Sequence, residues 1–307
     1  MKGTVIISKN HNTGDTVNFL TLTMRLSLAL AFLFFTVYSM GQPVRVMTYN
    51  IRLDTESDGN NQWKNRTGKV FDLIKKNTPD LLGVQEAMHN QMMDLKNNLT
   101  DYDFVGVGRD DGKQKGEYSA IFYKKDKFDV IAQNTFWLSE TPEVPGSKSW
   151  DAAITRVVTF AVLKDKATGK SFAYFNTHFD HIGKEARKNS AKVIKIYIAG
   201  LIAGSSTISE NRDLPLIVSG DFNSEPTDEP YQTMIDGRDM KLLDSRPSDD
   251  LTGTFCGFKV NEMKCKTIDY IFHSDHWKAN TYKVIQDHDG KYYPSDHLPV
   301  MASFTLK

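Results

Sequence analysis

Short runs of β-branched and aromatic residues recur from residue 44 to the end of the chain, separated by polar residues, glycine or proline. This punctuation is typical of β-strands. Two stretches, 65–76 and 184–203, instead repeat apolar residues at helical spacing. The mixture predicts an α/β fold built in layers. The predicted strands are 44–51, 81–85, 120–123, 157–163, 171–177, 214–219, 268–272 and 299–306.

The first 41 residues differ from the rest of the chain. Arg25 precedes an apolar run at residues 26–35, which is short for a membrane span, and the stretch ends near Gly41. This is the pattern of a secretory signal peptide. We expect residues 1–41 to be removed by cleavage, with Met24 as a possible true start; an uncleaved membrane anchor is the alternative. Either reading predicts export to the periplasm or the extracellular space.

The remainder, residues 42–307, has no repeat, low-complexity tract or linker, which predicts one domain. It carries 35 basic and 37 acidic side chains. That balance supplies no overall positive field for nucleic acid, so it argues against a tight polyanion binder without excluding a nuclease. The two cysteines, Cys256 and Cys265, either form a disulfide across a hairpin or remain as two buried thiols.

Polar side chains stand where several predicted strands end. Asp and Asn are common in turns, and a single histidine is more often structural than catalytic, so each position alone has an ordinary explanation. Asp269 is harder to explain in this way, because a charge inside an apolar strand is costly without a partner. Strand ends are also where layered α/β proteins place binding and catalytic groups. The positions are Asn50, Glu86, His178, Asp221 and Asp269.

Two further patches complete a set with a recognisable chemistry. With Asn223 and the triplet Ser295-Asp296-His297, the chain offers four carboxylates, two amides and two imidazoles in this set. Such a mixture suits a hard divalent cation and an activated water at a phosphate ester. Oxygen-rich ligands without a Cys/His cluster favour Mg²⁺, or Mn²⁺, over Zn²⁺.

The order and spacing of these patches resemble the endonuclease/exonuclease/phosphatase superfamily, the DNase I-like group that includes neutral sphingomyelinases and nocturnin-like enzymes. The resemblance spans residues 44–307. It implies a four-layer α/β sandwich, with two mixed β-sheets packed face to face and helices outside. It also implies hydrolysis of a phosphodiester or phosphomonoester by in-line attack of an activated water. The patches are 48–51, 85–86, 176–178, 220–223, 268–271 and 295–297.

The resemblance assigns roles to the metal and water positions. Glu86 is similar to the main Mg²⁺ ligand of the family, with Asn50 beside it and Asp296 assisting from across the site. Asn50 also belongs to the phosphate-binding set. Asp221 and Asn223 are similar to the pair that positions the attacking water and the phosphoryl oxygens.

A second group of residues is assigned to proton transfer and substrate contact. Asp269 is similar to the carboxylate that orients the catalytic His297, and either this pair or Asp221 is the general base. His178 is similar to the second catalytic histidine, which faces the leaving group or a phosphate oxygen. The resemblance implies that Glu117 supports this histidine, and Glu117 and Tyr118 are expected to contact substrate or phosphate.

The substrate is the least defined part of the prediction. Arg156 follows a long loop rich in proline, glycine and serine and is a candidate phosphate clamp, although a structural role explains it equally well. Trp63 and Arg66 resemble a Trp-x-x-Arg element of the nocturnin-like branch, or simply pack. We expect a phosphorylated small molecule, glycan, lipid headgroup or nucleic acid as substrate, and a monomer without an obligate protein partner. A secreted DNase- or RNase-type nuclease is the alternative, and a catalytically inactive binding protein is the third.

Overall fold

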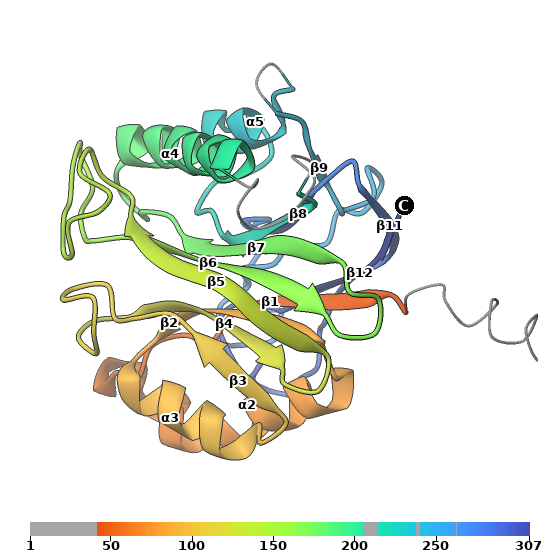
Figure 1. Ribbon diagram of the computed structural model, residues 1–307. Coiled ribbons are helices and arrows are strands. Elements are labelled where there is room, and N and C mark those ends of the chain that lie inside the picture. Colours follow the sequence, from red (N-terminus) through yellow and green to blue (C-terminus); the bar gives the residue numbers. More distant parts are fainter. Residues whose placement is uncertain (1–41, 205–213, 238–239, 262) are drawn as a thin grey trace, which may run out of the picture. The chain divides into compact units, whose positions relative to one another are not determined.

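Two β-sheets form the middle of the unit Pro43–Lys307, and helices lie on the outer face of each sheet (Figure 1). The computed structural model describes residues 42–204, 214–237, 240–261 and 263–307. The predicted signal peptide lies outside the described residues. Within those residues, no helix is long and apolar enough to cross a membrane.

The first sheet has the strand order β11-β12-β1-β2-β4-β3. β1 and β2 run parallel, and the other neighbours in this sheet are antiparallel. The strands are β1 (Val44–Asn50), β2 (Leu81–Ala87), β3 (Tyr102–Val105), β4 (Tyr118–Lys124), β11 (Trp277–Val284) and β12 (Val300–Leu306).

The second sheet has the order β5-β6-β7-β8-β10-β9, and here β7 and β8 are the parallel pair. Both sheets are therefore mixed. The strands are β5 (Phe128–Trp137), β6 (Val157–Asp165), β7 (Ser171–His178), β8 (Leu216–Asp221), β9 (Leu242–Asp244) and β10 (Asp269–Ser274).

Apolar side chains fill the space between the layers. One cluster, which includes Val46, Tyr174 and Ile271, lies between the two sheets. A second cluster packs α2 (Trp63–Asn77) and α3 (His89–Asn98) on the first sheet, and a third packs α4 (Lys184–Gly204) and α5 (Glu229–Ile235) on the second. A short 3₁₀ element, η1 (Glu56–Asn61), precedes α2. The predicted four-layer sandwich is confirmed.

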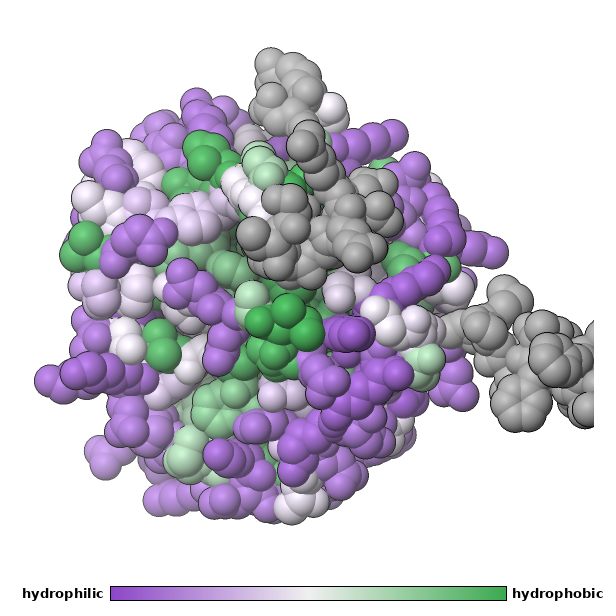
Figure 2. Space-filling view, in the orientation of Figure 1, coloured by the Kyte–Doolittle hydropathy of each residue, from purple (hydrophilic) through white to green (hydrophobic). Residues whose placement is uncertain are grey.

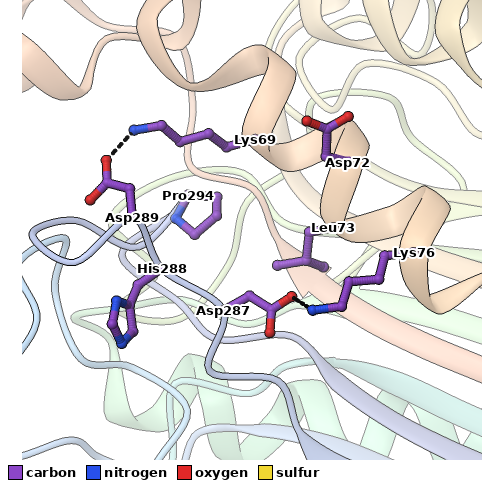
Figure 3. Close-up of a pocket in the computed structure, with 8 residues that line it drawn as sticks. All are labelled: Lys69, Asp72, Leu73, Lys76, Asp287, His288, Asp289 and Pro294. Carbon is purple, nitrogen blue, oxygen red and sulfur yellow. Dashed lines mark hydrogen bonds and ion pairs between the residues drawn. The ribbon is translucent and has the colours of Figure 1, made fainter.

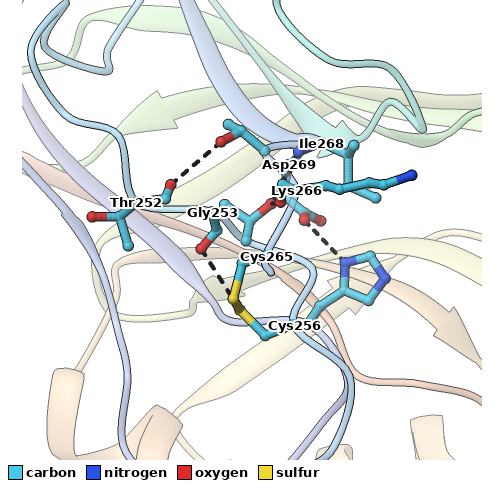
Figure 4. The surroundings of a disulfide bond; sticks show 10 residues. Thr252, Gly253, Cys256, Cys265, Lys266, Ile268 and Asp269 are labelled. Carbon is cyan, nitrogen blue, oxygen red and sulfur yellow. Dashed lines mark hydrogen bonds and ion pairs between the residues drawn. A yellow bond between two sulfur atoms is a disulfide. The ribbon is translucent and has the colours of Figure 1, made fainter. Parts of the chain in front are cut away.

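Most of the surface shown in Figure 2 is hydrophilic, with hydrophobic residues in separate patches. Cys256 and Cys265 form a disulfide, which decides between the two alternatives for these residues (Figure 4). The bond closes a hairpin in which Phe255 pairs with Lys266. This hairpin contacts the strand end at Asp269, whose backbone N–H donates to Thr254 Oγ1.

Candidate active site

The topology explains why distant polar residues meet. Parallel pairing places Asn50 at the end of β1 beside Gln85 on β2, and His178 at the end of β7 beside Asp221 on β8. Antiparallel pairing then sets Asp269 opposite Asp221. The strand ends open into a cleft of about 330 Å³. Its lining includes Arg52, Leu53, Glu86, Glu117, Ile154, Arg156, His178, His181, Asp221, Asn223, Phe255, Ile268, Asp296 and His297.

Several backbone positions at this cleft have left-handed conformations. Arg52, Glu86 and Asn223 have φ values of 57°, 60° and 46°. Non-glycine residues adopt this region at a cost, and such positions cluster at functional sites. Gly220 has φ 150°, and a Cβ there would lie 2.1 Å from the carbonyl oxygen of Thr177, so only glycine allows β7 and β8 to approach in this way.

His297 is held by the carboxylate of Asp269. The imidazole Nδ1 donates to Asp269 Oδ2 at 2.9 Å, and the backbone N–H of Asp269 donates to Thr254 Oγ1 at 3.1 Å. Burial lowers the pKa of His297, but the carboxylates of Asp269 and Asp221 outweigh burial and raise the pKa to about 10. The bond to Asp269 fixes the ring so that Nε2 faces Asp221, at 3.6 Å from Oδ2.

His178 presents a lone pair to the cleft. Asn223 Nδ2 donates to the carbonyl of Phe179 at 3.0 Å, which orients the amide so that its second N–H points at His178 Nε2, also at 3.0 Å. Nε2 is therefore an acceptor and the proton is on Nδ1, which has no hydrogen-bond partner in the described part of the chain. Burial, reinforced by Arg156, lowers the pKa of His178 well below 6.5, so the ring is neutral at pH 7.

Asn50 organises two carboxylates with the nitrogen of its amide. Nδ2 donates to Glu86 Oε1 and to Asp221 Oδ2, each at 3.0 Å, while Oδ1 accepts the backbone N–H of Arg52. Burial raises the pKa of Glu86, but the Asn50 hydrogen bond and the His297 charge lower it below the ordinary value. One lone pair of Asn50 Oδ1 is used by the backbone N–H and a second is left, so the role of Asn50 as a metal ligand stays a prediction.

The donor set fits a divalent cation. One ligand atom from each of Glu86, His178 and Asp221 lies within 4.8 Å of the others. His178 Nε2 and Asp221 Oδ2 are 3.3 Å apart, and both offer lone pairs, so they repel unless a proton or a cation lies between them. Burial and the neighbouring Asp269 raise the pKa of Asp221 to about 7. Carboxylate oxygens with one imidazole are ligands that hard and borderline cations accept.

Asp296 lies across the cleft from Glu86, and Arg52 lies between them. The guanidinium of Arg52 is 3.7 Å from Glu86 Oε2 and 3.9 Å from Asp296 Oδ2. Two hydrogen bonds to Asp58, at 3.0 and 2.9 Å, hold it in place. Among the described residues, Asp296 is in neither of the two sets of three convergent ligand atoms. The structure places Asp296 at the cleft, and its role as a metal ligand stays a prediction.

Glu117 reaches the cleft, but its partner differs from the predicted one. It accepts a hydrogen bond from Arg109 Nη1 at 2.6 Å and lies 4.0 Å from Arg156 Nη1. The predicted support of His178 by Glu117 is wrong, because the buried arginines attract this carboxylate instead. Tyr118 is also misassigned. Its side chain packs in the core under the first sheet, and its hydroxyl donates to the carbonyl of Lys113.

Arg156 faces the cleft with unused hydrogen-bonding capacity. Its side chain is 5% exposed and lies 3.9 Å from Asp180, and Nη2 is 3.1 Å from His181 Nδ1. Nε and Nη1 have no hydrogen-bond partner among the described residues. Their nearest charged neighbours are the carboxylates of Asp180 and Glu117, at 3.9 and 4.0 Å.

Two charged or titratable residues that line the cleft, and one arginine bonded to a lining residue, were not predicted as site residues. Arg52 follows Asn50 by two positions, and its charge beside a predicted ligand could have drawn attention to it. His181 follows His178 by three positions and lines the same cleft. Arg109 lies in the glycine-rich segment 106–113, and its side chain is 12% exposed and ion-paired with Glu117.

This fold and this site define a hydrolase of the two-sheet sandwich class, whose family members act on phosphate esters. A model of the Endonuclease/Exonuclease/phosphatase family matches residues 47–297, and the chain belongs to that family. The resemblance seen in the sequence is thus confirmed.

Solved structures and curated proteins agree with this membership. A family protein from Bacteroides thetaiotaomicron is 37% identical, with a TM-score of 0.79 over 87% of this chain and 96% of that chain. A mannosyl-6-phosphatase from Bacteroides thetaiotaomicron VPI-5482 is 38% identical, with a TM-score of 0.78 over 86% of this chain and 100% of that chain. Nocturnin from Mus musculus is 23% identical over 87% of this chain and 67% of its own length.

Proposed function

We propose that this protein is an exported, Mg²⁺-dependent phosphomonoesterase that removes phosphate from a phosphorylated sugar or glycan. The observation that carries the proposal is the buried guanidinium of Arg156, which lines the cleft and has two nitrogens without a hydrogen-bond partner among the described residues. A terminal phosphate offers three oxygens and up to two charges to such a group. The similarity to a mannosyl-6-phosphatase supports a sugar as the alcohol part.

The chain's own groups divide the work of in-line displacement at phosphorus. Arg156 and Arg52 bind non-bridging oxygens and orient the phosphate. Asp221 and the Asp269–His297 pair are close enough to one another, with 3.6 Å between Asp221 Oδ2 and His297 Nε2, to pass one proton from the attacking water between them. A lone pair of the water oxygen forms the new bond to phosphorus while the bond from phosphorus to the sugar oxygen breaks. The proton taken from the water is then returned to the sugar oxygen, which leaves as an alcohol.

Glu86 and Asp221 would hold the cation, with Asp296 nearby, and His178 would join them if its Nε2 lone pair were released from the Asn223 N–H. When bound, a divalent cation supplies electrostatic stabilisation of the negative charge that develops on the phosphoryl oxygens. The carboxylate-rich donor set favours Mg²⁺, with Mn²⁺ as a substitute.

The test is a comparison of substrates with the purified protein. Mannose 6-phosphate and other sugar phosphates are assayed beside bis-p-nitrophenyl phosphate, RNA and plasmid DNA, with Mg²⁺ or with EDTA. We expect metal-dependent release of inorganic phosphate from a sugar monoester, and no release by D221N. Faster cleavage of RNA or DNA, with the steep loss of affinity in salt that several phosphate contacts produce, would overturn the proposal in favour of a nuclease.

The export part of the proposal rests on the signal-peptide pattern and is supported by the Cys256–Cys265 disulfide, since such bonds persist in oxidising compartments. N-terminal sequencing of the protein from its native host should find Gln42 or a near neighbour as the first residue. Recovery of the uncleaved chain with the membrane fraction would favour the anchor instead.

A further inference from the structure

Arg66 is a buried cation outside the cleft whose contacts are all to the backbone. It lies on α2 and is 3% exposed. Its guanidinium has five N–H groups, and all five donate to carbonyl oxygens, so none is left for a carboxylate. The rings of Trp63 and Phe258 lie 5.1 and 5.5 Å from its central carbon.

The carbonyls that Arg66 binds belong to three segments. One is that of Asn61 in η1, at 2.8 Å, and three lie after β1, those of Ile51, Arg52 at 2.6 Å and Leu53 at 3.3 Å. The fifth is that of Pro294 at 3.3 Å, two residues before Asp296, which lines the cleft. One guanidinium therefore joins the segment after β1 to the segment that precedes the last strand.

The opposite edge of the first segment faces the candidate metal ligands. The backbone N–H of Arg52 donates to Asn50 Oδ1 at 3.0 Å, and that of Leu53 donates to Glu86 Oε2 at 3.2 Å. Residues 51–53 are thus fixed between Arg66 on their carbonyl side and the Asn50–Glu86 pair on their amide side. The left-handed conformation of Arg52, with φ 57°, is held by these contacts.

The ion pairs on the surface of α2 are too weak to hold this helix against the segment that contains Pro294. In Figure 3, Lys69 pairs with Asp289 at 2.5 Å and Lys76 pairs with Asp287 at 2.6 Å, and both pairs tie α2 to the loop before Pro294. All four side chains are at least 36% exposed, and exposed pairs contribute little. The buried, five-bond contact of Arg66 is the stronger link.

We infer that Arg66 is a positioning residue of the site: it sets Arg52, Glu86 and Asp296 for binding of the cation and the phosphate. The role in binding the cation and the phosphate rests on the proposed function, whereas the hydrogen bonds of Arg66 do not depend on any substrate. A lysine has three donors and no planar fork, so it cannot replace these contacts.

The test uses R66K, with V70A as the matched control, because Val70 is buried in the same helix and its truncation destabilises α2 without removing a side-chain hydrogen bond to residues 51–53. Two readouts are independent of turnover: hydrogen exchange at the amides of Arg52 and Leu53 in metal-free protein, and Mn²⁺ affinity by calorimetry. We expect R66K to speed exchange and weaken Mn²⁺ binding by about tenfold each, and V70A to leave both near wild type.

Exchange and Mn²⁺ affinity of R66K that match those of V70A would overturn the inference. If R66K does not fold, R66M is measured in the same way. Loss of folding in both variants, with V70A folded, would make Arg66 a residue required for folding and would also overturn it. A wild-type protein that binds Mn²⁺ but cleaves no sugar phosphate would refute the proposed function while leaving this comparison intact.

Discussion

Reduction of the Cys256–Cys265 disulfide should both destabilise the domain and lower its activity. The two residues are nine positions apart. Loop-closure entropy for a loop of this length corresponds to about 2.6 kcal/mol at 25 °C. For a unit of about 265 residues, with an unfolding entropy of about 2.1 cal/mol/K per residue, this loss lowers Tm by about 5 °C.

The effect on activity follows from the contacts of the hairpin (Figure 4). The backbone N–H of Cys256 donates to the carbonyl of Asp296 at 3.0 Å. Thr254 Oγ1 accepts the N–H of Asp269 at 3.1 Å, and the ring of Phe255 lies 4.9 Å from that of His297. A loosened hairpin therefore shifts both members of the Asp269–His297 pair, and we expect kcat to fall with Tm.

The assay is thermal unfolding and phosphate release with and without a phosphine reductant, with free thiols counted in parallel. The control is the double variant C256S/C265S, which should match the reduced wild type and ignore the reductant. An unchanged Tm in wild-type protein with both thiols free would refute the reasoning. The Tm test is valid whatever the substrate is, because loop-closure entropy involves the chain alone.

Three further outcomes are expected. D221N and H297A should each lower kcat by at least about a hundredfold with an unchanged circular dichroism spectrum, and near-wild-type turnover in either would remove that residue from the proton-transfer group. R156K should raise KM for a phosphomonoester by about tenfold or more, and an unchanged KM would mean that the arginine does not bind the phosphate. Burial raises the pKa of Asp80, but Arg45 and other bonded cations lower it below the ordinary value, so its stabilising effect is complete above about pH 4 and disappears as the pH falls through the lowered pKa. In urea unfolding, the free energy of unfolding of D80N should fall less steeply below about pH 4 than that of wild type. An equally steep fall in both proteins would show that Asp80 does not make this contribution.

The pattern of strands that the sequence predicted has a physical cause. All eight predicted strands occupy interior places in the two sheets, and the four that were not predicted, β3, β5, β9 and β11, are the four edge strands. Interior strands are buried on both faces and read as continuous apolar runs. In β5 and β11 only a few residues are buried, and the polar residues between them interrupt the apolar pattern that predicts a strand. β9 has only three residues, too few for a pattern. The two long helices, α2 and α4, were predicted from their repeated apolar residues. α3 has only three buried residues and was not predicted.

Within the candidate site, the residue types and strand ends were enough to bring together Glu86, Asp221, Asp269 and His297. Alternation along a strand could have corrected one error. Glu117 directly precedes Tyr118, the first residue of β4, and successive side chains along extended backbone point to opposite faces. A cleft position for Glu117 therefore excludes Tyr118, which packs in the core.

Other roles depend on partners that no local pattern names. Glu117 is bonded to Arg109 because the turn between them brings the two side chains to 2.6 Å, and this pairing leaves His178 Nδ1 without an acceptor. The same holds for Arg66, whose value as a positioning residue comes from the carbonyl of Pro294, 228 positions away. An arginine inside a helical pattern indicates exposure, because a buried guanidinium is costly unless its donors are met. The five carbonyls come together only in the folded chain, where residues 51–53 lie near Pro294. The burial of Arg66 therefore could not be predicted from the sequence.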